Sequence, residues 1–178
     1  MIKRFEYMLS QKEFLELLIN KGFNYDIHQH SPLFTVEDSN KLRGEIKGVH
    51  SKNLFLKNKK NKFFLISCQE FTNINLKSIS KSLNLGNVSF ARSEYLITLL
   101  GIKPGSVTPF ALLNNVENNI DFYLEDKLYE SEYINFHPLT NTATVTIKSN
   151  DFIKFMIENK KKIHIFSSSK EAIVKTYE

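Results

Sequence analysis

The sequence predicts an α+β fold, with a mixed, largely antiparallel sheet and helices packed around it. Segments with helical periodicity and segments with strand-like alternation are interspersed along the 178 residues, without the regular order of a doubly wound parallel sheet. No repeat, low-complexity stretch or Pro/Gly-rich linker divides the chain. The composition, 42% hydrophobic and 12% aromatic, is that of a globular protein, so residues 1–178 are expected to form one domain.

Five segments carry helical signals. At the first, Ser10 and Glu13 are spaced as a capping box, in which hydroxyl and carboxylate satisfy backbone donors reciprocally, and Gly22 is placed to end the helix. At the fourth, Gly101 ends the helix and Pro104 prevents its continuation. The expected helices lie between Ser10 and Gly22 and over residues 35–43, 76–83, 91–100 and 151–159.

Other segments either alternate between apolar and polar residues or are continuously apolar, and both patterns are typical of strands. Two of them flank a basic turn and are expected to pair as a hairpin, which places Lys52 at the beginning of a strand. The tail from Ser167 onward is interpreted as a surface extension. The expected strands cover residues 23–28, 53–56, 62–67, 107–112, 121–124, 127–129, 143–148 and 163–166.

The single cysteine, Cys68, ends the apolar run 63–68, which indicates a buried strand residue. One cysteine cannot make a disulfide framework or a cysteine-ligated zinc site, and it indicates a reducing compartment. The N-terminal segment lacks the apolar core and cleavage site of a signal peptide, and no window is long enough to span a bilayer. A cytoplasmic protein without a membrane partner is therefore expected.

Basic residues outnumber acidic ones by 24 to 19, and the net charge of +5 favours a polyanionic partner. The densest basic stretch contains Lys57, Lys59 and Lys60. Such a run is equally typical of a solvated turn. Charge alone therefore leaves nucleic-acid binding and a plain surface turn both open.

Signatures of several enzyme classes are missing, because there is no GxSxG elbow, P-loop, GxGxxG after a strand or HExxH. Among the five histidines, His28 and His30 share a strand face at i, i+2 and could chelate a metal ion. Two exposed loop histidines are the favoured interpretation of this pair. We therefore expect neither a metal nor another cofactor.

The segment 101–109 is a turn rich in glycine and proline between a helix and a strand. Gly105 lets the backbone approach a ligand closely, and Pro109 stiffens the exit. Exposed N–H groups there could hold an ester carbonyl or a phosphate. Taken alone, the segment is more typical of a tight helix-to-strand connection.

Four segments together resemble a known family. They are His30–Glu37 (HSPLFTVE), Lys52–Leu56 (KNLFL), Gly105–Pro109 (GSVTP, of GxxxP form) and His137–Thr144 (HPLTNTAT). In order and spacing they are similar to the YbaK/ProX family of prolyl-tRNA editing proteins, and the resemblance covers residues 10–160. The second and fourth segments look more like the alanyl-specific ProX branch than the cysteine-directed YbaK branch.

The resemblance implies a single YbaK-like aminoacyl-tRNA editing domain over residues 1–178, with a curved mixed sheet surrounded by helices. It implies a trans-editing deacylase, which hydrolyses the ester between a wrong amino acid and the 3′ end of tRNA(Pro). The expected partner is the acceptor end of tRNA(Pro), and prolyl-tRNA synthetase is open as a second partner. Alanine is the first expectation for the amino acid removed, with serine, threonine and cysteine open. A tRNA- or synthetase-binding module without catalysis, and a hydrolase of another small acyl ester, are the alternatives.

By resemblance, the expected catalytic residues are Lys52, Gly105 and His137. Lys52 would place positive charge at the ester oxygens or the terminal phosphate, and the Gly105–Pro109 loop would offer backbone donors. His137 would line the amino-acid pocket beside Asn141, which would bond the substrate, and a role of His137 as general base is open. Activated water is the expected nucleophile, without a covalent intermediate. The other expected substrate-binding residues are Asn53, Ser106, Val107, Thr108 and Pro109, and the expected tRNA-binding residues are Lys57, Lys59 and Lys60.

Overall fold

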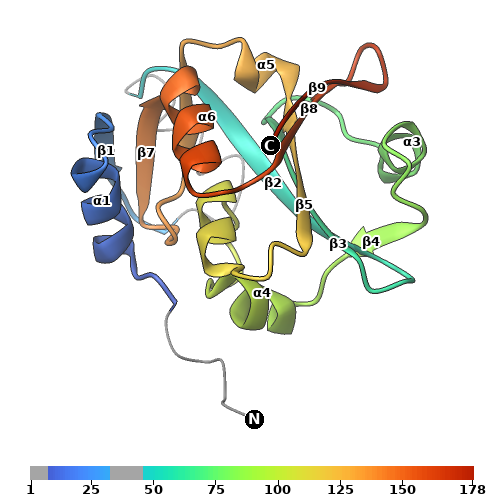
Figure 1. Cartoon of the computed structure of the whole chain (residues 1–178), viewed down its shortest axis with the longest axis horizontal. Helices are drawn as coiled ribbons and strands as arrows, with labels where there is room; N and C mark the ends of the chain where they lie inside the picture. Colours follow the sequence, from blue (N-terminus) through green and yellow to red (C-terminus); the bar gives the residue numbers. More distant parts are fainter. Residues whose placement is uncertain (1–7, 33–45) are drawn as a thin grey trace.

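The computed structural model describes residues 8–32 and 46–178, which form a nine-stranded sheet with helices packed against it (Figure 1). The strand order is β1-β7-β6-β2-β3-β5-β8-β9, and β4 pairs with β2. The strands are β1 (Tyr25–Gln29), β2 (Val49–Asn58), β3 (Phe63–Gln69), β4 (Val88–Phe90), β5 (Ile120–Glu125), β6 (Tyr133–Phe136), β7 (Ala143–Lys148), β8 (Ile163–Ser167) and β9 (Ala172–Tyr177).

The helices begin and end largely where local signals place them. The capping box at the start of the first helix is confirmed, because Ser10 Oγ accepts the N–H of Glu13 and the Glu13 carboxylate accepts the N–H of Ser10. Gly101 ends the fourth helix in the left-handed conformation, with φ of 65°. The helices are α1 (Gln11–Asn20), α3 (Leu76–Ser82), α4 (Ser93–Leu100), α5 (Asp126–Tyr129), α6 (Ser149–Glu158) and the 3-10 helix η1 (Pro109–Asn114).

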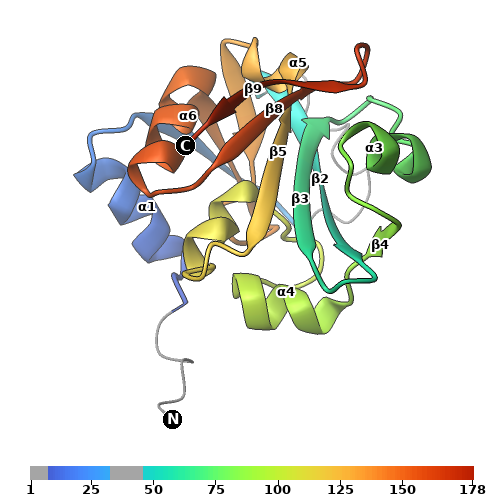
Figure 2. The same ribbon diagram turned by 45° about the vertical axis from the view of Figure 1, so that its right-hand side comes forward.

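Five of the eight ladders within the described ranges are antiparallel, and three are parallel. The parallel ladders join β2 to β6, β3 to β5 and β5 to β8. The strands twist across the molecule, as Figure 2 shows. The predicted α+β class with a mixed, largely antiparallel curved sheet is thus confirmed.

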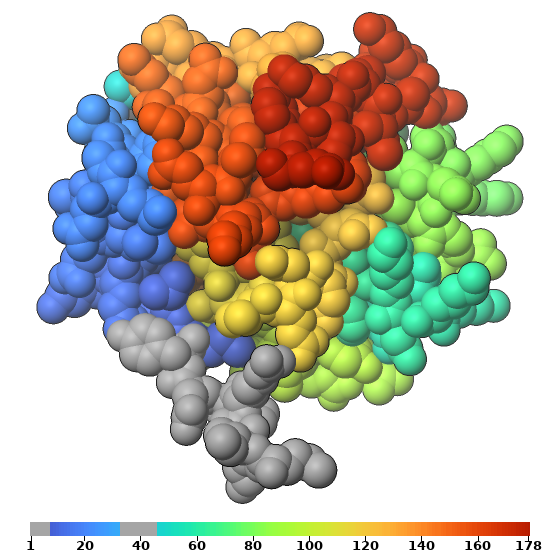
Figure 3. Space-filling model, in the orientation of Figure 1, coloured from blue at the N-terminus to red at the C-terminus, as the bar shows by residue number. Residues whose placement is uncertain are grey.

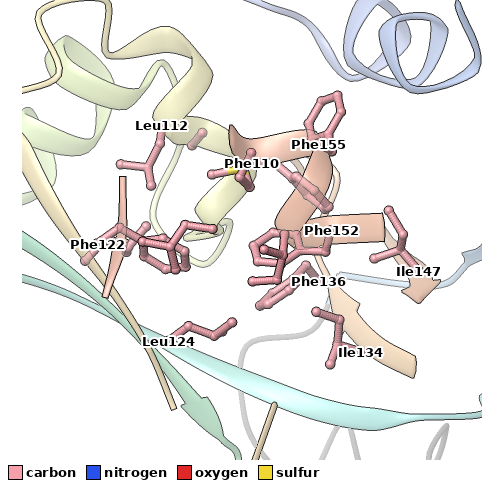
Figure 4. Packing of buried hydrophobic residues seen from close by; sticks show 14 of the residues in the cluster. Phe110, Leu112, Phe122, Leu124, Ile134, Phe136, Ile147, Phe152 and Phe155 are labelled. Atoms are coloured by element: carbon pink, nitrogen blue, oxygen red, sulfur yellow. The ribbon is translucent and has the colours of Figure 1, made fainter. Parts of the chain in front are cut away.

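The larger core lies between the sheet and the helices α1, α4, η1 and α6 (Figure 4). At its centre, the ring of Phe110 lies 5.7 Å from that of Phe136 and 5.6 Å from that of Phe152. A smaller core on the other face packs α3 against β2, β3 and β5. In the space-filling view, the segment that contains α6, β8 and β9 covers much of the front of the molecule (Figure 3).

Two predicted strands are wrong. Residues 107–112 do not form a strand, because Pro109 opens the 3-10 helix η1, where its fixed φ is favourable and its missing N–H costs nothing. Residues 127–129 belong to the short helix α5, in which Glu130 N donates to Asp126 O at 2.8 Å and Leu128 is buried. Short segments of this kind give too few residues to separate the two periodicities.

The C-terminal tail is not a simple surface extension, because residues 172–177 form β9 and pair with β8. The strands β4 and β6 were also absent from the prediction; they are three and four residues long. The helix expected over 35–43 lies outside the described residues. In the ranges that the structure describes, no helix is both long enough and apolar enough to cross a bilayer.

Candidate functional site

A row of polar side chains crosses the sheet on the face opposite to α6. Lys52 of β2 pairs in register with Cys68 of β3, and His28 of β1 pairs with Thr144 of β7. The remaining members follow when neighbouring registers, such as His50 with Asn135, are continued along the strands. In strand order the row is Glu125, Cys68, Lys52, His137, Thr144 and His28.

Lys52 is half-buried near the middle of this row. Its Nζ donates a hydrogen bond to the backbone oxygen of Thr72, in the connection between β3 and α3. Its position on β2 confirms that the residue lies in a strand, although the strand begins three residues earlier, at Val49. The contact fixes the ammonium group on the β3 side of the row.

A buried carboxylate lies directly behind this contact. Glu125 is fully buried and accepts hydrogen bonds from Gln69 N at 2.8 Å, Thr72 Oγ1 at 2.9 Å and Ser168 Oγ at 2.7 Å. Lys127 Nζ lies 3.9 Å from its Oε1. We call Gln69, Thr72, Glu125, Lys127 and Ser168 the Glu125 cluster. Because a buried charge is tolerated only when it is paired and hydrogen-bonded, this cluster holds the segment that anchors Lys52.

On the other side of Lys52 lie two imidazoles, His30 and His137, with ring centroids 6.1 Å apart. His137 Nδ1 lies 2.9 Å from the carbonyl oxygen of Ala143, which can only accept, so the neutral ring carries its proton on Nδ1 and a lone pair on Nε2. Burial lowers the pKa of His137 and so favours this neutral form. His30 Nε2 bonds Thr144 Oγ1 at 3.0 Å. We call His30, His137 and Thr144 the histidine cluster.

Asn53 lies on the opposite face of β2 and holds the Gly105–Pro109 loop. Its Nδ2 donates to Val107 O at 3.0 Å, and its Oδ1 accepts from Ser67 Oγ at 2.5 Å. Gly105 has a φ of 86°, a conformation that favours glycine. The loop exit contacts the end of β6 through the packing of Phe110 on Phe136. The loop therefore contacts β2 and β6 on the face of the sheet opposite to the Lys52 row.

The other predicted substrate-binding residues differ in exposure. Ser106 and Thr108 are buried, and the Thr108 hydroxyl has no hydrogen-bond partner among the described residues. Pro109 is also buried and starts η1. Asn141 is half-buried in the connection between β6 and β7. Asn141 and Val107, which is also half-buried, are the ones with side-chain surface to offer a ligand.

Of the predicted tRNA-binding lysines, Lys57 lies at the end of β2, where its Nζ bonds Tyr95 Oη at 3.2 Å. Lys59 and Lys60 are exposed in the turn between β2 and β3. Lys57 and Lys59, but not Lys60, line a groove of about 460 Å³ beside β4 and α4. The basic turn is thus one wall of a concave surface.

Burial raises the pKa of the Cys68 thiol to about 12, so Cys68 is not a nucleophile although it lies beside Lys52 in register. His28 and His30 are not exposed loop residues, because His28 belongs to β1 and both side chains are half-buried. No group of three or more potential metal ligands occurs among the described side chains.

Sequence reasoning missed Glu125 and Thr72. An acidic residue directly after the predicted strand 121–124 was the available signal for Glu125, because a carboxylate that continues a buried strand needs partners. Thr72 gave no signal, since it acts through a backbone oxygen and through a hydroxyl whose partner, Glu125, lies 53 residues away in the sequence.

Comparison with known proteins identifies the family. A profile of the family described as "Aminoacyl-tRNA editing domain" matches residues 30–155. The chain is 35% identical to prolyl-tRNA synthetase associated domain-containing protein 1 of Bos taurus over 136 residues, covering 74% of this chain and 79% of that protein. It is 28% identical to prolyl-tRNA editing protein ProX of Acetoanaerobium sticklandii, covering 76% of this chain and 84% of that protein.

The fold of this chain is also similar to that of a solved structure. A crystal structure of a proposed trans-editing enzyme for prolyl tRNA synthetase superposes with a TM-score of 0.64 at 15% identity, covering 88% of this chain and 96% of that chain. At this identity the match shows a shared fold. The profile, by contrast, includes all four segments on which the resemblance rests. This chain therefore belongs to the aminoacyl-tRNA editing domain family.

Proposed function

We propose that this protein is a trans-editing deacylase that hydrolyses Ala-tRNA(Pro) in the cytoplasm, with residues 1–178 acting as one editing domain. The observation that carries the proposal is the row in which Lys52 lies between a buried carboxylate and a neutral histidine. Membership of the editing family and the likeness to ProX supply the substrate class.

In the proposed reaction, water attacks the ester carbonyl, the bond to the ribose oxygen breaks, and alanine and tRNA(Pro) leave. His137 Nε2 accepts a proton from the water, because its lone pair is available when Nδ1–H is committed to Ala143, and the imidazolium returns this proton to the ribose oxygen as the ester bond breaks. Lys52 stabilises the negative charge that develops on the ester oxygen. Gly105 allows the backbone of its loop, which Asn53 holds on the other face of β2, to approach the substrate from that side.

Selectivity follows from size in this proposal. The Ser106–Pro109 segment and Asn141 form walls that admit a methyl side chain and exclude the pyrrolidine ring of proline by overlap. A pocket for a small group rejects a larger one effectively, whereas each additional methylene that fits gains only about 1–3 kcal/mol. Serine, threonine and cysteine are the competing amino acids to test.

A decisive experiment compares deacylation of Ala-, Ser-, Thr-, Cys- and Pro-tRNA(Pro) by the wild type and by Lys52→Ala. We expect selective loss of the alanyl ester and a fall in kcat of at least about 100-fold in the variant, because one charge-stabilising group typically contributes that much. Lys12→Ala, at an exposed position of α1, is the matched control and should retain the wild-type rate.

Two outcomes would overturn the proposal. If none of the five esters is hydrolysed while tRNA(Pro) still binds, the protein is a binding module. If a simple alanyl ester without tRNA is hydrolysed as fast as Ala-tRNA(Pro), the protein is a hydrolase of small acyl esters.

A further inference from the structure

A small cavity of about 90 Å³ lies where the end of η1, the end of α6 and the starts of β5 and β8 approach one another. In Figure 3, the orange segment that ends α6 adjoins the yellow segment that follows η1, near the centre of the view. We infer that this cavity binds a phosphate dianion, either the free ion or the terminal phosphate of a nucleotide. The polar lining includes Asn118, Asp121, Lys160, Lys161, Lys162 and His164.

Lys161 is a buried cation whose partners are neutral. The residue is 9% exposed, and its Nζ donates to Asn115 O at 2.9 Å and to Asn118 Oδ1 at 2.5 Å. No ion pair within the described ranges includes Lys161. Asn115 follows η1, and the carbonyl end of a helix supplies at most about half of a negative charge. Because a buried charge is costly unless it is paired, an anion in the adjoining cavity supplies the missing counter-charge.

The carboxylate of the cavity is neutralised within the protein. Asp121 Oδ2 lies 2.6 Å from Lys62 Nζ, so its negative charge is already paired. Lys162 Nζ is paired in the same way with Glu178 Oε1, at 2.5 Å. The repulsion that Asp121 exerts on an anion is therefore reduced, and the charge of Lys162 is largely used.

Two positive charges remain at the cavity, those of Lys160 and Lys161. Lys160 is exposed and, like Lys161, takes part in no ion pair among the residues that the structure describes. A phosphate monoester carries a charge of about −1.5 to −2 at pH 7, which matches these two cations. A phosphodiester or a carboxylate carries only one charge. The charge balance therefore favours free phosphate or a terminal phosphate group.

Neutral donors complete the lining. Asn118 Oδ1 is bonded to Lys161, which leaves the amide NH₂ group of Asn118 to donate. His164 Nδ1 lies 2.9 Å from Thr176 Oγ1, which leaves Nε2 for another partner. With the ammonium groups, these nitrogens offer a tetrahedral ion donors from several elements of the fold.

The size of the cavity agrees with one phosphate group. Its volume of about 90 Å³ exceeds the roughly 10–15 Å³ that one water requires and is well below the roughly 300–1,000 Å³ of a site that encloses a drug-sized ligand. The base and sugar of a nucleotide would therefore lie outside it.

This cavity is separate from the row that contains Lys52. Asp121 lies near the start of β5, and Glu125, at the other end of the row from His28, ends the same strand. Four residues of strand separate the two, a distance of about 13 Å at 3.3 Å per residue. Phosphate binding is thus a property of a second site, whether or not the protein is a deacylase.

Isothermal titration calorimetry measures the binding of inorganic phosphate at constant ionic strength. We expect a Kd of about 1 mM or lower for the wild type. The Kd should increase about tenfold or more in Lys161→Met and about threefold in Lys160→Ala, because a buried charged donor contributes more than an exposed one. Lys154→Ala, at an exposed position of α6 outside the cavity, removes the same charge and should leave the Kd unchanged.

Two further measurements locate the site without the buried variant. Lys160 is exposed, so Lys160→Ala tests the cavity even where Lys161→Met lacks a cooperative urea transition. In NMR spectra of the wild type, phosphate should shift the imidazole signals of His164 and leave those of His28, on β1, unchanged.

Two other ligands identify the form of phosphate that is bound. AMP that binds as tightly as phosphate would identify a nucleotide ligand, and binding of phosphate alone would identify the free ion. Dimethyl phosphate, which carries one charge, should bind more weakly, and equal binding of this diester would contradict the dianion. The site is ruled out if the wild type shows no saturable phosphate binding. It is also ruled out if Lys160→Ala binds like the wild type without a shift of His164, or if Lys154→Ala loses as much affinity as Lys160→Ala.

Discussion

The Glu125 cluster and the histidine cluster lie on opposite sides of Lys52 and differ in how completely their polar atoms are bonded. Glu125 is fully buried, and its two oxygens accept three kinds of donor and face an ammonium group. His137 is held by one backbone oxygen and is only half-buried. The hydrogen bonds of the Glu125 cluster hold it in one arrangement. The histidine cluster retains a nitrogen atom, Nε2 of His137, that can exchange a proton.

This difference suggests that one cluster has a structural role and the other a role in proton transfer. The fully hydrogen-bonded carboxylate of Glu125 contributes rigidity, because any movement of its cluster leaves a buried polar group without its partner. A neutral imidazole with one free lone pair can take up a proton without such a penalty. Lys52 belongs to both regions, since its resting contact is with Thr72 and the β2–β6 register, continued by two residues, places it beside His137.

Removal of the buried carboxylate should have the largest effect on stability. Glu125→Ala leaves the donors of Gln69, Thr72 and Ser168 without an acceptor, and we expect the free energy of unfolding to fall by about 3–5 kcal/mol. Glu125→Gln keeps the shape and one acceptor oxygen and should cost less. Urea denaturation measures both, and a loss below about 1 kcal/mol in Glu125→Ala would contradict the assigned anchoring role.

The histidine cluster should show the opposite pattern. His137→Asn can still donate a hydrogen bond to Ala143 O but offers no basic nitrogen, so we expect kcat for Ala-tRNA(Pro) to fall about 100-fold with little change in stability. Single-turnover deacylation and urea denaturation of the same preparation provide the two readouts. A rate within threefold of the wild type would restrict His137 to lining the pocket.

Sequence patterns predicted the elements whose signals are local. The capping box at Ser10, the hairpin around residues 57–62 and the α6 face with Phe152 and Phe155 required only neighbours in the chain, and the structure contains all three. The strand expected over 107–112 failed because apolar residues after Pro109 pack equally well in a 3-10 helix. Tertiary contact with Phe136, invisible in the sequence, decides between them.

The candidate site was predictable only in part, for the same reason. Lys52 and His137 were named from their motifs, but the row that contains them depends on the parallel pairing of β2 with β6, in which His50 pairs with Asn135, 85 residues later in the sequence. Glu125 enters the row through β5, which is brought beside β3 by another parallel ladder. Parallel neighbouring strands are not joined by a tight turn that the sequence could reveal. Hydrophobic periodicity therefore could not show which strands are neighbours in the sheet.

The pH dependence of stability should show the smallest effect and should come from the imidazoles. Burial lowers the pKa of His137 and of His164, so below the ordinary value of about 6.5 the unfolded chain binds more protons than the folded protein. Stability from these groups is therefore complete above pH 6.5 and declines as the pH falls toward their folded-state pKa.

We expect the Tm at pH 5.5 to be a few degrees lower than at pH 7.5, and the decline to be smaller in His137→Asn and in His164→Asn. A Tm that is constant over this range, or a decline unchanged in both variants, would mean that neither imidazole is held neutral by the fold.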